Sequence, residues 1–350
     1  MATSSYQLKC RQTVGSLLLL MCFVSHYAAA RPSFLLTPLD EQPKDQTPEL
    51  DLESGASRSL KFLVPSPSLV LNYHNGPILS AATGIPIYII WYGTFSAAQK
   101  SIVTDFFASF SSEETGPSVG SWWNLTSGYK NSAGGSVSSK IFLAGEMAVS
   151  YTTGTTLTET DVQTLVVNSL ATFPSNANGI YLVLTASDVM VQDFCMNSCA
   201  SHFATLPSGV TNEHQLPYAW VGNPAGSTEC LGLCAWPFAN PTYGPQGTPL
   251  VAPNGDVGMD GMVINLAVIL AGTATDPFNT GFYQGDASAP LESASACAGI
   301  FGAGSYPGYP GDLLVDPATG ASYNVNGNNG RKFLMPALWD PSKLACVAPY

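Results

Sequence analysis

The chain has 350 residues, of which only 10% are charged, and its formal net charge is −12 at pH 7. A nucleic-acid-binding surface needs clustered lysine and arginine, but this chain has only 12 such residues and no basic cluster. Glycine (33 residues), proline (26) and aromatic residues are plentiful. The composition therefore excludes a nucleic-acid partner and predicts a surface of neutral polar side chains, which suits sugar-rich surroundings.

Residues 1–30 have the order of a secretory signal peptide. Lys9 and Arg11 precede a short apolar run at 15–24, and three alanines at 28–30 offer a cleavage site. The run is shorter than the roughly 20 residues that span a bilayer. We therefore expect an exported protein without a membrane span, whose net charge becomes −14 when the two basic residues are removed.

The rest of the chain divides once. Residues 31–59 are rich in proline and acidic side chains, so this segment buries little and is predicted to be a flexible leader. From residue 60 to residue 350 the composition is steady, with no second linker. This length suits one compact domain.

Apolar patterning and capping signals place the secondary structure of this domain. The predicted elements are, in chain order, a buried strand at 85–91, a helix after Ser96, a helix after Thr158, strands at 180–185 and 218–221, and a mostly buried helix at 259–271. Beyond Thr275, glycine, proline, tyrosine and asparagine predict long loops. We expect an α+β fold with a central mixed sheet, flanking helices and disulfide-clamped loops.

Six cysteines remain after removal of the signal peptide, namely Cys195, Cys199, Cys230, Cys234, Cys297 and Cys346. An even set in an exported chain predicts three disulfides, and six thiols allow fifteen pairings. The two Cys-x-x-x-Cys spacings also suit a structural zinc site, but an oxidising destination favours disulfides. No metal or cofactor is expected.

Nucleophile and metal motifs are weak. Gly116 to Gly120 fits the esterase pattern G-x-S-x-G, but Pro117 beside Ser118 favours the start of a helix. There is no H-E-x-x-H motif. The candidate histidines are His74, which a turn with Asn75 holds in place, His202 and His214; a three-histidine zinc site remains an alternative.

Carboxylates are few, and Asp276 and Glu292 are kept as candidate site residues. Asp256 and Asp260 resemble a calcium loop only loosely, because the alternating spacing of an EF-hand is absent. A glycosidase with paired carboxylates remains open, since its two acids need not be near in sequence.

Aromatic residues offer a possible sugar-binding face, and core packing is the competing interpretation. Seven are considered: Trp122, Trp123, Tyr129, Trp220, Trp236, Tyr306 and Tyr309. Asn124, in the sequence Asn-Leu-Thr, is the predicted acceptor of an N-linked glycan.

A string of motifs between about Leu60 and Cys346 resembles the Exordium (phosphate-induced protein) family of plants. The motifs include YHNGP at 73–77, WYG at 91–93, FCM at 194–196, CAWPF at 234–238, PLVAPNGDVG at 249–258, DGMVINLA at 260–267 and SYPGY at 305–309. The resemblance implies an extracellular protein of the plant cell wall space with a part in cell expansion linked to brassinosteroid and carbon status. It supplies no catalytic residue.

A remoter similarity concerns secreted zinc peptidases whose H-E helix is followed by T-D-P, an acid and a cysteine. Here the helix carries Val268 and Ile269 before Thr275-Asp276-Pro277, which implies a degenerate zincin-like scaffold.

Two hypotheses of function follow from the sequence. The first is a non-enzymatic growth-regulating protein that binds a wall glycan or an extracellular protein. The second is an extracellular hydrolase, metal-dependent or carboxylate-based, that acts on wall material.

Overall fold

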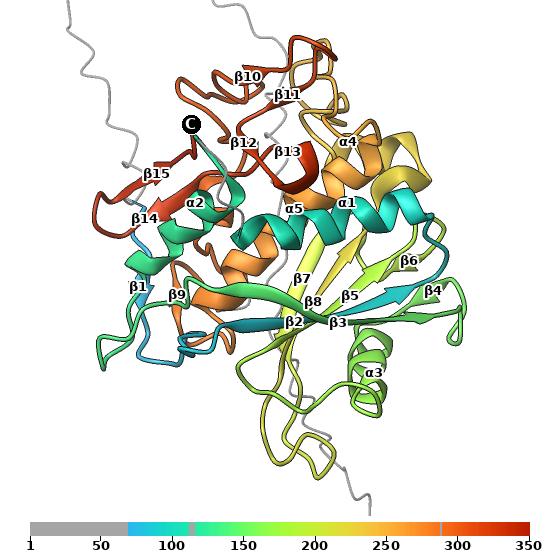
Figure 1. The fold of residues 1–350 in the computed structure, drawn as a ribbon, viewed down its shortest axis with the longest axis vertical. Helices are drawn as coiled ribbons and strands as arrows, with labels where there is room; N and C mark the ends of the chain where they lie inside the picture. The colour runs from blue at the N-terminus through green and yellow to red at the C-terminus, as the bar shows by residue number, and fades with distance from the viewer. Residues whose placement is uncertain (1–68, 112–115, 288) are drawn as a thin grey trace, which may run out of the picture.

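A computed structural model describes residues 69–350 apart from 112–115 and 288. The predicted signal peptide (1–30) and leader (31–59) lie outside the described residues. The described part is built around a five-stranded mixed sheet with helices on both faces (Figure 1). The α+β expectation with a central mixed sheet is confirmed.

The central sheet has the strand order β3-β2-β5-β8-β7. These strands are β3 (Ile141–Val149), β2 (Ile85–Tyr92), β5 (Ile180–Thr185), β8 (Pro217–Gly222) and β7 (Ala200–Ala204). Four strands are parallel, and the edge strand β7 runs antiparallel to β8. Every residue of β2, β5 and β8 is buried, as central strands covered on both faces require.

The described residues form five α-helices. They are α1 (Ala97–Ala108), α2 (Val119–Trp123), α3 (Glu159–Ser169), α4 (Thr228–Cys234) and α5 (Val257–Thr275). Helices α1 and α5 pack on one face of the sheet and α3 packs on the other (Figure 1). The predicted capping boxes form at Ser96 and Thr158, which begin α1 and α3.

Helix α5 is the core helix of the domain. It is long and apolar enough to cross a membrane by length and composition, but 89% of its apolar window is buried in the protein. Asp256 caps its N-terminus by accepting a hydrogen bond from the amide of Met259 (3.0 Å). Asp276 is the residue at its C-terminal end. The helix runs beside β7 and β8, so its last turns lie close to the sheet edge.

Loops after α5 are tied by short strand pairs. These pairs are β1 (Asn72–Tyr73) with β9 (Phe282–Tyr283), β10 (Leu314–Val315) with β11 (Ser322–Tyr323), β12 (Val325–Asn326) with β13 (Lys332–Phe333), and β14 (Leu338–Asp340) with β15 (Ala345–Val347). A further pair joins β4 (Thr156–Leu157) to β6 (Met190–Val191). Short strand pairs therefore order the predicted long loops.

Three disulfides clamp the second half of the chain. Cys195 pairs with Cys230 and Cys199 pairs with Cys234, so two parallel bridges hold the segment before β7 against α4. Cys297 pairs with Cys346 and holds β15 against the loop after β9. Of the fifteen pairings that the sequence left open, the structure selects this one.

Candidate functional site

Three of the candidate residues meet in a buried cluster between β7 and α5. His202 comes from β7, Asp276 from the end of α5, and Glu292 from the loop after β9. The Nε2 atom of His202 lies 2.8 Å from Oε1 of Glu292. His202 and Asp276 are fully buried, and Glu292 is 5% exposed. We call these three residues the buried ionisable cluster.

Local backbone features bring the buried ionisable cluster together. The Oδ1 atom of Asp276 accepts hydrogen bonds from the amides of Thr280 (2.7 Å) and Gly281 (2.6 Å), which turns the chain after α5. Gly272 faces the ion pair, because a Cβ atom built there would lie 2.7 Å from Oε2 of Glu292. Because Gly272 has no side chain, the carboxylate of Glu292 can pack directly against the backbone of α5 at this position.

Burial and neighbouring charges set the proton affinities of the buried ionisable cluster. Burial is the largest effect on His202 and lowers its pKa, but the charges of Glu292 and Asp276 outweigh it and leave the pKa raised. Burial, followed by the charge of Glu292, raises the pKa of Asp276. The Nδ1 atom of His202 and the Oδ2 atom of Asp276 have no hydrogen-bond partner among the described residues. Within the cluster, His202 and Asp276 therefore hold a proton more tightly than they would in water.

The other candidate residues do not join this cluster. The ring of His74 stacks on Tyr283 with ring centroids 3.7 Å apart, and the side chain is exposed at the β1–β9 pair. Asn75 follows in a left-handed turn with φ of 67°. His214 is exposed in the loop between β7 and β8. The three histidines are thus placed on separate elements, and the structure gives the three-histidine alternative no common centre.

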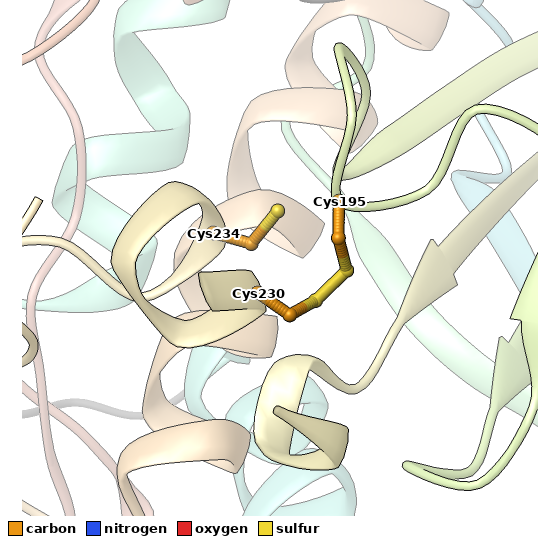
Figure 2. Close-up of side chains that lie close together, drawn as sticks. All are labelled: Cys195, Cys230 and Cys234. Atoms are coloured by element: carbon orange, nitrogen blue, oxygen red, sulfur yellow. A yellow bond between two sulfur atoms is a disulfide. The ribbon is translucent and has the colours of Figure 1, made fainter. Parts of the chain in front are cut away.

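One group of potential metal ligands does converge, and it consists of cysteines. The sulfur atoms of Cys195, Cys230 and Cys234 lie within 4.8 Å of one another (Figure 2). Cys195 is bonded to Cys230, and Cys234 is bonded to Cys199. Because the metal ligand is the thiolate and not the disulfide, these sulfurs are occupied as bridges. Among the described residues, no other three histidine, cysteine or acidic side chains, those of the buried ionisable cluster included, bring their ligand atoms close enough together to hold a metal ion.

The weaker motifs of the sequence have structural roles. Ser118 caps α2 and accepts a hydrogen bond from the amide of Ser121, so it begins a helix as expected. Asp260 is buried and accepts hydrogen bonds from the backbone and the side-chain amide of Asn254 (2.9 and 2.6 Å). Burial raises the pKa of Asp260 to about 7. Asp256 and Asp260 therefore support the turn before α5.

The aromatic candidates separate into core and surface residues. Trp122, Trp123, Tyr129 and Trp220 are at most 2% exposed. Each donates its polar hydrogen to a buried acceptor: Trp122 to Pro336 O (2.8 Å), Trp123 to Ser138 O (3.0 Å), Tyr129 to Trp339 O (2.6 Å) and Trp220 to Thr185 Oγ1 (3.0 Å). The core interpretation holds for these four. Trp236, Tyr306 and Tyr309 remain at the surface.

Trp236 and Tyr309 line a groove of about 300 Å³, which we call the Trp236 groove. One wall is the loop after α4, from Trp236 to Leu250, and the other is formed by residues 308–315, which end in β10, together with Ser322 of β11. The backbone amide of Leu250 donates to the carbonyl of Pro237 (3.0 Å), which closes the loop on itself. Five prolines and the two aromatic residues are among the lining residues of the groove, together with the neutral polar residues Asn240, Thr248 and Ser322.

None of the described residues that line the Trp236 groove is Asp, Glu, Lys, Arg or His. The members of the buried ionisable cluster line neither this groove nor a smaller cavity of about 20 Å³ beside β7 and β8. A ligand in the groove would therefore meet aromatic faces and neutral polar groups.

Comparisons with known proteins agree with the motifs. A family model described as the phosphate-induced protein 1 conserved region matches residues 71–349. The chain belongs to the Exordium (phosphate-induced protein) family. It is 49% identical over 297 residues to the protein PHOSPHATE-INDUCED 1 of Nicotiana tabacum, covering 83% of this chain and 92% of the relative. It is 46% identical over 303 residues to the protein EXORDIUM of Arabidopsis thaliana, covering 84% and 93%. No solved structure gives a significant match.

The groove of this Exordium-family chain was only partly visible in its sequence. Trp236 and Tyr309 were selected as sugar-binding candidates, but the wall of prolines between residues 237 and 249 was not. The signal was available, because prolines recur at 237, 241, 245 and 249, which favours an extended, exposed loop beside the aromatic residue. The predicted glycan acceptor, Asn124, is exposed at the end of α2 and stays a prediction.

Proposed function

We propose that this Exordium-family chain is secreted into the plant cell wall space and binds a neutral wall glycan in the Trp236 groove. Binding there would serve a role in regulating cell expansion, linked to brassinosteroid and carbon status, as the family resemblance implies. The observation that carries the proposal is an open groove with two aromatic side chains and no ionisable carboxylate or amine.

Secretion is supported by covalent chemistry. Three disulfides in a plant protein persist in an oxidising compartment, and the signal-like segment at 1–30 supplies the route. A tagged chain expressed in plant cells should appear in the extracellular fluid with residues 1–30 removed and no free thiol. An intact cytosolic precursor with six free thiols after residue 190 would contradict this part of the proposal.

Recognition of sugar is supported by the groove's chemistry. Sugar rings present apolar C–H faces that pack on aromatic rings, and their hydroxyls pair with amide and hydroxyl groups. Trp236 is half-buried, and its ring packs against Phe301 with centroids 5.8 Å apart, so its position is fixed before binding. Fixed aromatic rings lower the ordering cost of binding.

A neutral ligand is favoured by electrostatics. Anionic pectic chains need cationic partners, which the groove lacks, and the whole chain carries a net charge of −12. We expect neutral oligosaccharides, such as fragments of xyloglucan or cellulose, to bind and oligogalacturonides to be rejected. The hydrolase alternative gains no support from the buried ionisable cluster, because its acids and histidine line neither described cavity.

A calorimetric titration with matched variants tests the proposal. Trp236→Ala should weaken binding of a neutral oligosaccharide about tenfold, which corresponds to about 1.4 kcal/mol for the loss of one stacking ring. Tyr243→Ala is the control, because Tyr243 is 71% exposed on the same loop but does not line the groove. Absence of binding to every wall polysaccharide, or unchanged affinity in Trp236→Ala, would overturn the proposal.

A further inference from the structure

A tight turn beside the groove brings two tyrosines face to face. In Tyr306-Pro307-Gly308-Tyr309 the amide of each tyrosine donates to the carbonyl of the other (3.0 and 2.8 Å). Proline precedes glycine at the two central positions, and Gly308 has a φ of 90°, the pattern of a type II turn. Residues that exchange both hydrogen bonds project their side chains to the same side. The backbone therefore fixes the two rings next to each other.

Both rings are close together and reachable from solvent. Their centroids are 5.1 Å apart, and the ring planes are tilted by 36°. Tyr306 is 65% exposed, and Tyr309 is partly exposed. Small rotations about the side-chain bonds therefore bring ring carbons of the two tyrosines into contact without a change in the backbone.

The carboxylate of Asp312 accepts a hydrogen bond from one of the two phenols. The hydroxyl of Tyr309 donates to Oδ1 of Asp312 at 2.7 Å. This hydrogen bond holds the proton on Tyr309 and raises the pKa of the phenol. When an electron leaves the ring, the phenol becomes strongly acidic, and the carboxylate is already placed to accept its proton. Asp312 is thus a positioning residue for one-electron oxidation of Tyr309.

We propose that Tyr306 and Tyr309 form an oxidative coupling site whose product is an intramolecular dityrosine. The oxidant is hydrogen peroxide, used by a haem peroxidase. Each phenol loses one electron and one proton, the two radicals join through ring carbons next to the oxygens, and both rings then return to the phenol form. Two hydrogen atoms leave the protein, and one hydrogen peroxide becomes two water molecules. The new carbon–carbon bond would lock the turn that borders the Trp236 groove.

The proposal is independent of glycan binding, because it rests on the tyrosine pair alone. Tyr309→Phe separates the two ideas, since phenylalanine keeps the ring at the groove but cannot form the phenoxyl radical. Tyr243 and Tyr350 are internal controls: they are 71% and 54% exposed, and no aromatic ring stacks on either among the described residues. If solvent exposure alone decided which tyrosines couple, Tyr243 and Tyr350 would react as readily as Tyr306.

The test treats the purified, disulfide-bonded chain with horseradish peroxidase and limiting hydrogen peroxide at low protein concentration. We expect a monomer that has lost the mass of two hydrogen atoms, with blue dityrosine fluorescence and one cross-linked peptide containing residues 306 and 309. Tyr306→Phe and Tyr309→Phe should each abolish this product, and Tyr243→Phe should leave its yield unchanged.

The role of Asp312 has its own readout. Asp312→Asn should couple more slowly than the natural chain, because the amide that replaces the carboxylate is a far weaker acceptor for the proton that leaves Tyr309, and Asp312→Glu should recover part of the rate. The proposal is overturned if oxidation gives only intermolecular dimers, if the cross-link joins other tyrosines, or if Tyr309→Phe still yields the same monomeric product.

Discussion

The buried ionisable cluster and the Trp236 groove use side chains in opposite ways. His202, Asp276 and Glu292 have the chemistry of an enzyme site but are enclosed between β7 and α5. The groove has an opening of about 300 Å³, but none of its described lining residues carries a carboxylate, an amine, a guanidinium or an imidazole. The acidic and imidazole side chains of the buried ionisable cluster therefore contribute to the packing of β7 on α5, whereas the accessible Trp236 groove is suited to binding a neutral ligand.

The largest expected change in stability concerns the ion pair between His202 and Glu292 in the buried ionisable cluster. Glu292→Ala leaves His202 fully buried without its nearest partner, and breaking a buried pair in this way costs about 3–5 kcal/mol of unfolding free energy. Chemical denaturation followed by tryptophan fluorescence measures the loss. Lys343→Ala is the control, because Lys343 is 61% exposed in its ion pair with Asp340 and should change stability little. A stable Glu292→Ala protein would show that the pair does not hold β7 to α5.

The raised pKa values of the buried titratable side chains determine how stability should depend on pH. His202, Asp276 and Asp260 all have a raised pKa in the folded state, so the folded state binds protons more tightly than the unfolded state. Their contribution is complete at acidic pH and is lost as the pH rises through the folded values. For Asp260, between its ordinary value of 3.8 and about 7, the loss is on the order of 4 kcal/mol.

Thermal unfolding at a series of pH values measures this dependence. The melting temperature should fall between about pH 5 and pH 8, and Asp260→Asn should flatten part of the slope. Burial raises the pKa of Asp340, but hydrogen bonds outweigh it and leave the pKa lowered, and hydrogen bonds also lower the pKa of Asp161; stability should therefore also fall at strongly acidic pH. A melting temperature that rises steadily from pH 5 to pH 8 would contradict the assigned directions.

A smaller effect is expected at the helix position that faces the ion pair. In Gly272→Ala the new methyl group would meet Oε2 of Glu292 at 2.7 Å, so the carboxylate must move, at a cost of about 1–3 kcal/mol. Gly209→Ala is the control, because its nearest neighbouring atom would be 4.0 Å away. If both variants unfold at the same denaturant concentration as the natural chain, Glu292 does not pack against α5 as described.

Much of the sheet and its helices could be predicted from local sequence. The runs at 85–91 and 180–185 are apolar except for Thr185, as expected of strands covered on both faces, and they form β2 and β5. Strands β3 and β7 were not predicted. Both lie at edges of the sheet: β3 alternates in exposure and contains Gly145 and Glu146, and β7 has only five residues. Because an edge strand is less completely buried than a central one, its apolar pattern is weak, and the sequence therefore did not predict β3 and β7.

The candidate site was less predictable because it depends on long-range contacts. Asp276 and Glu292 were chosen because acids are scarce, but their meeting with His202 is fixed by the packing of β7 on α5, which joins residues 90 apart in sequence. Residue type also does not decide burial for tryptophan. Trp122 and Trp123 lie in the core and Trp236 at the surface, and only the tertiary fold separates them.

Quenching of tryptophan fluorescence tests the central claim, glycan binding in the Trp236 groove, most directly. Five of the six tryptophans are at most 4% exposed, so nearly all acrylamide-quenchable emission should come from Trp236 and should be absent in Trp236→Ala. We predict that a saturating neutral oligosaccharide protects this emission and that an oligogalacturonide does not. Unchanged quenching with every neutral oligosaccharide, or equal protection by the acidic one, would contradict the account.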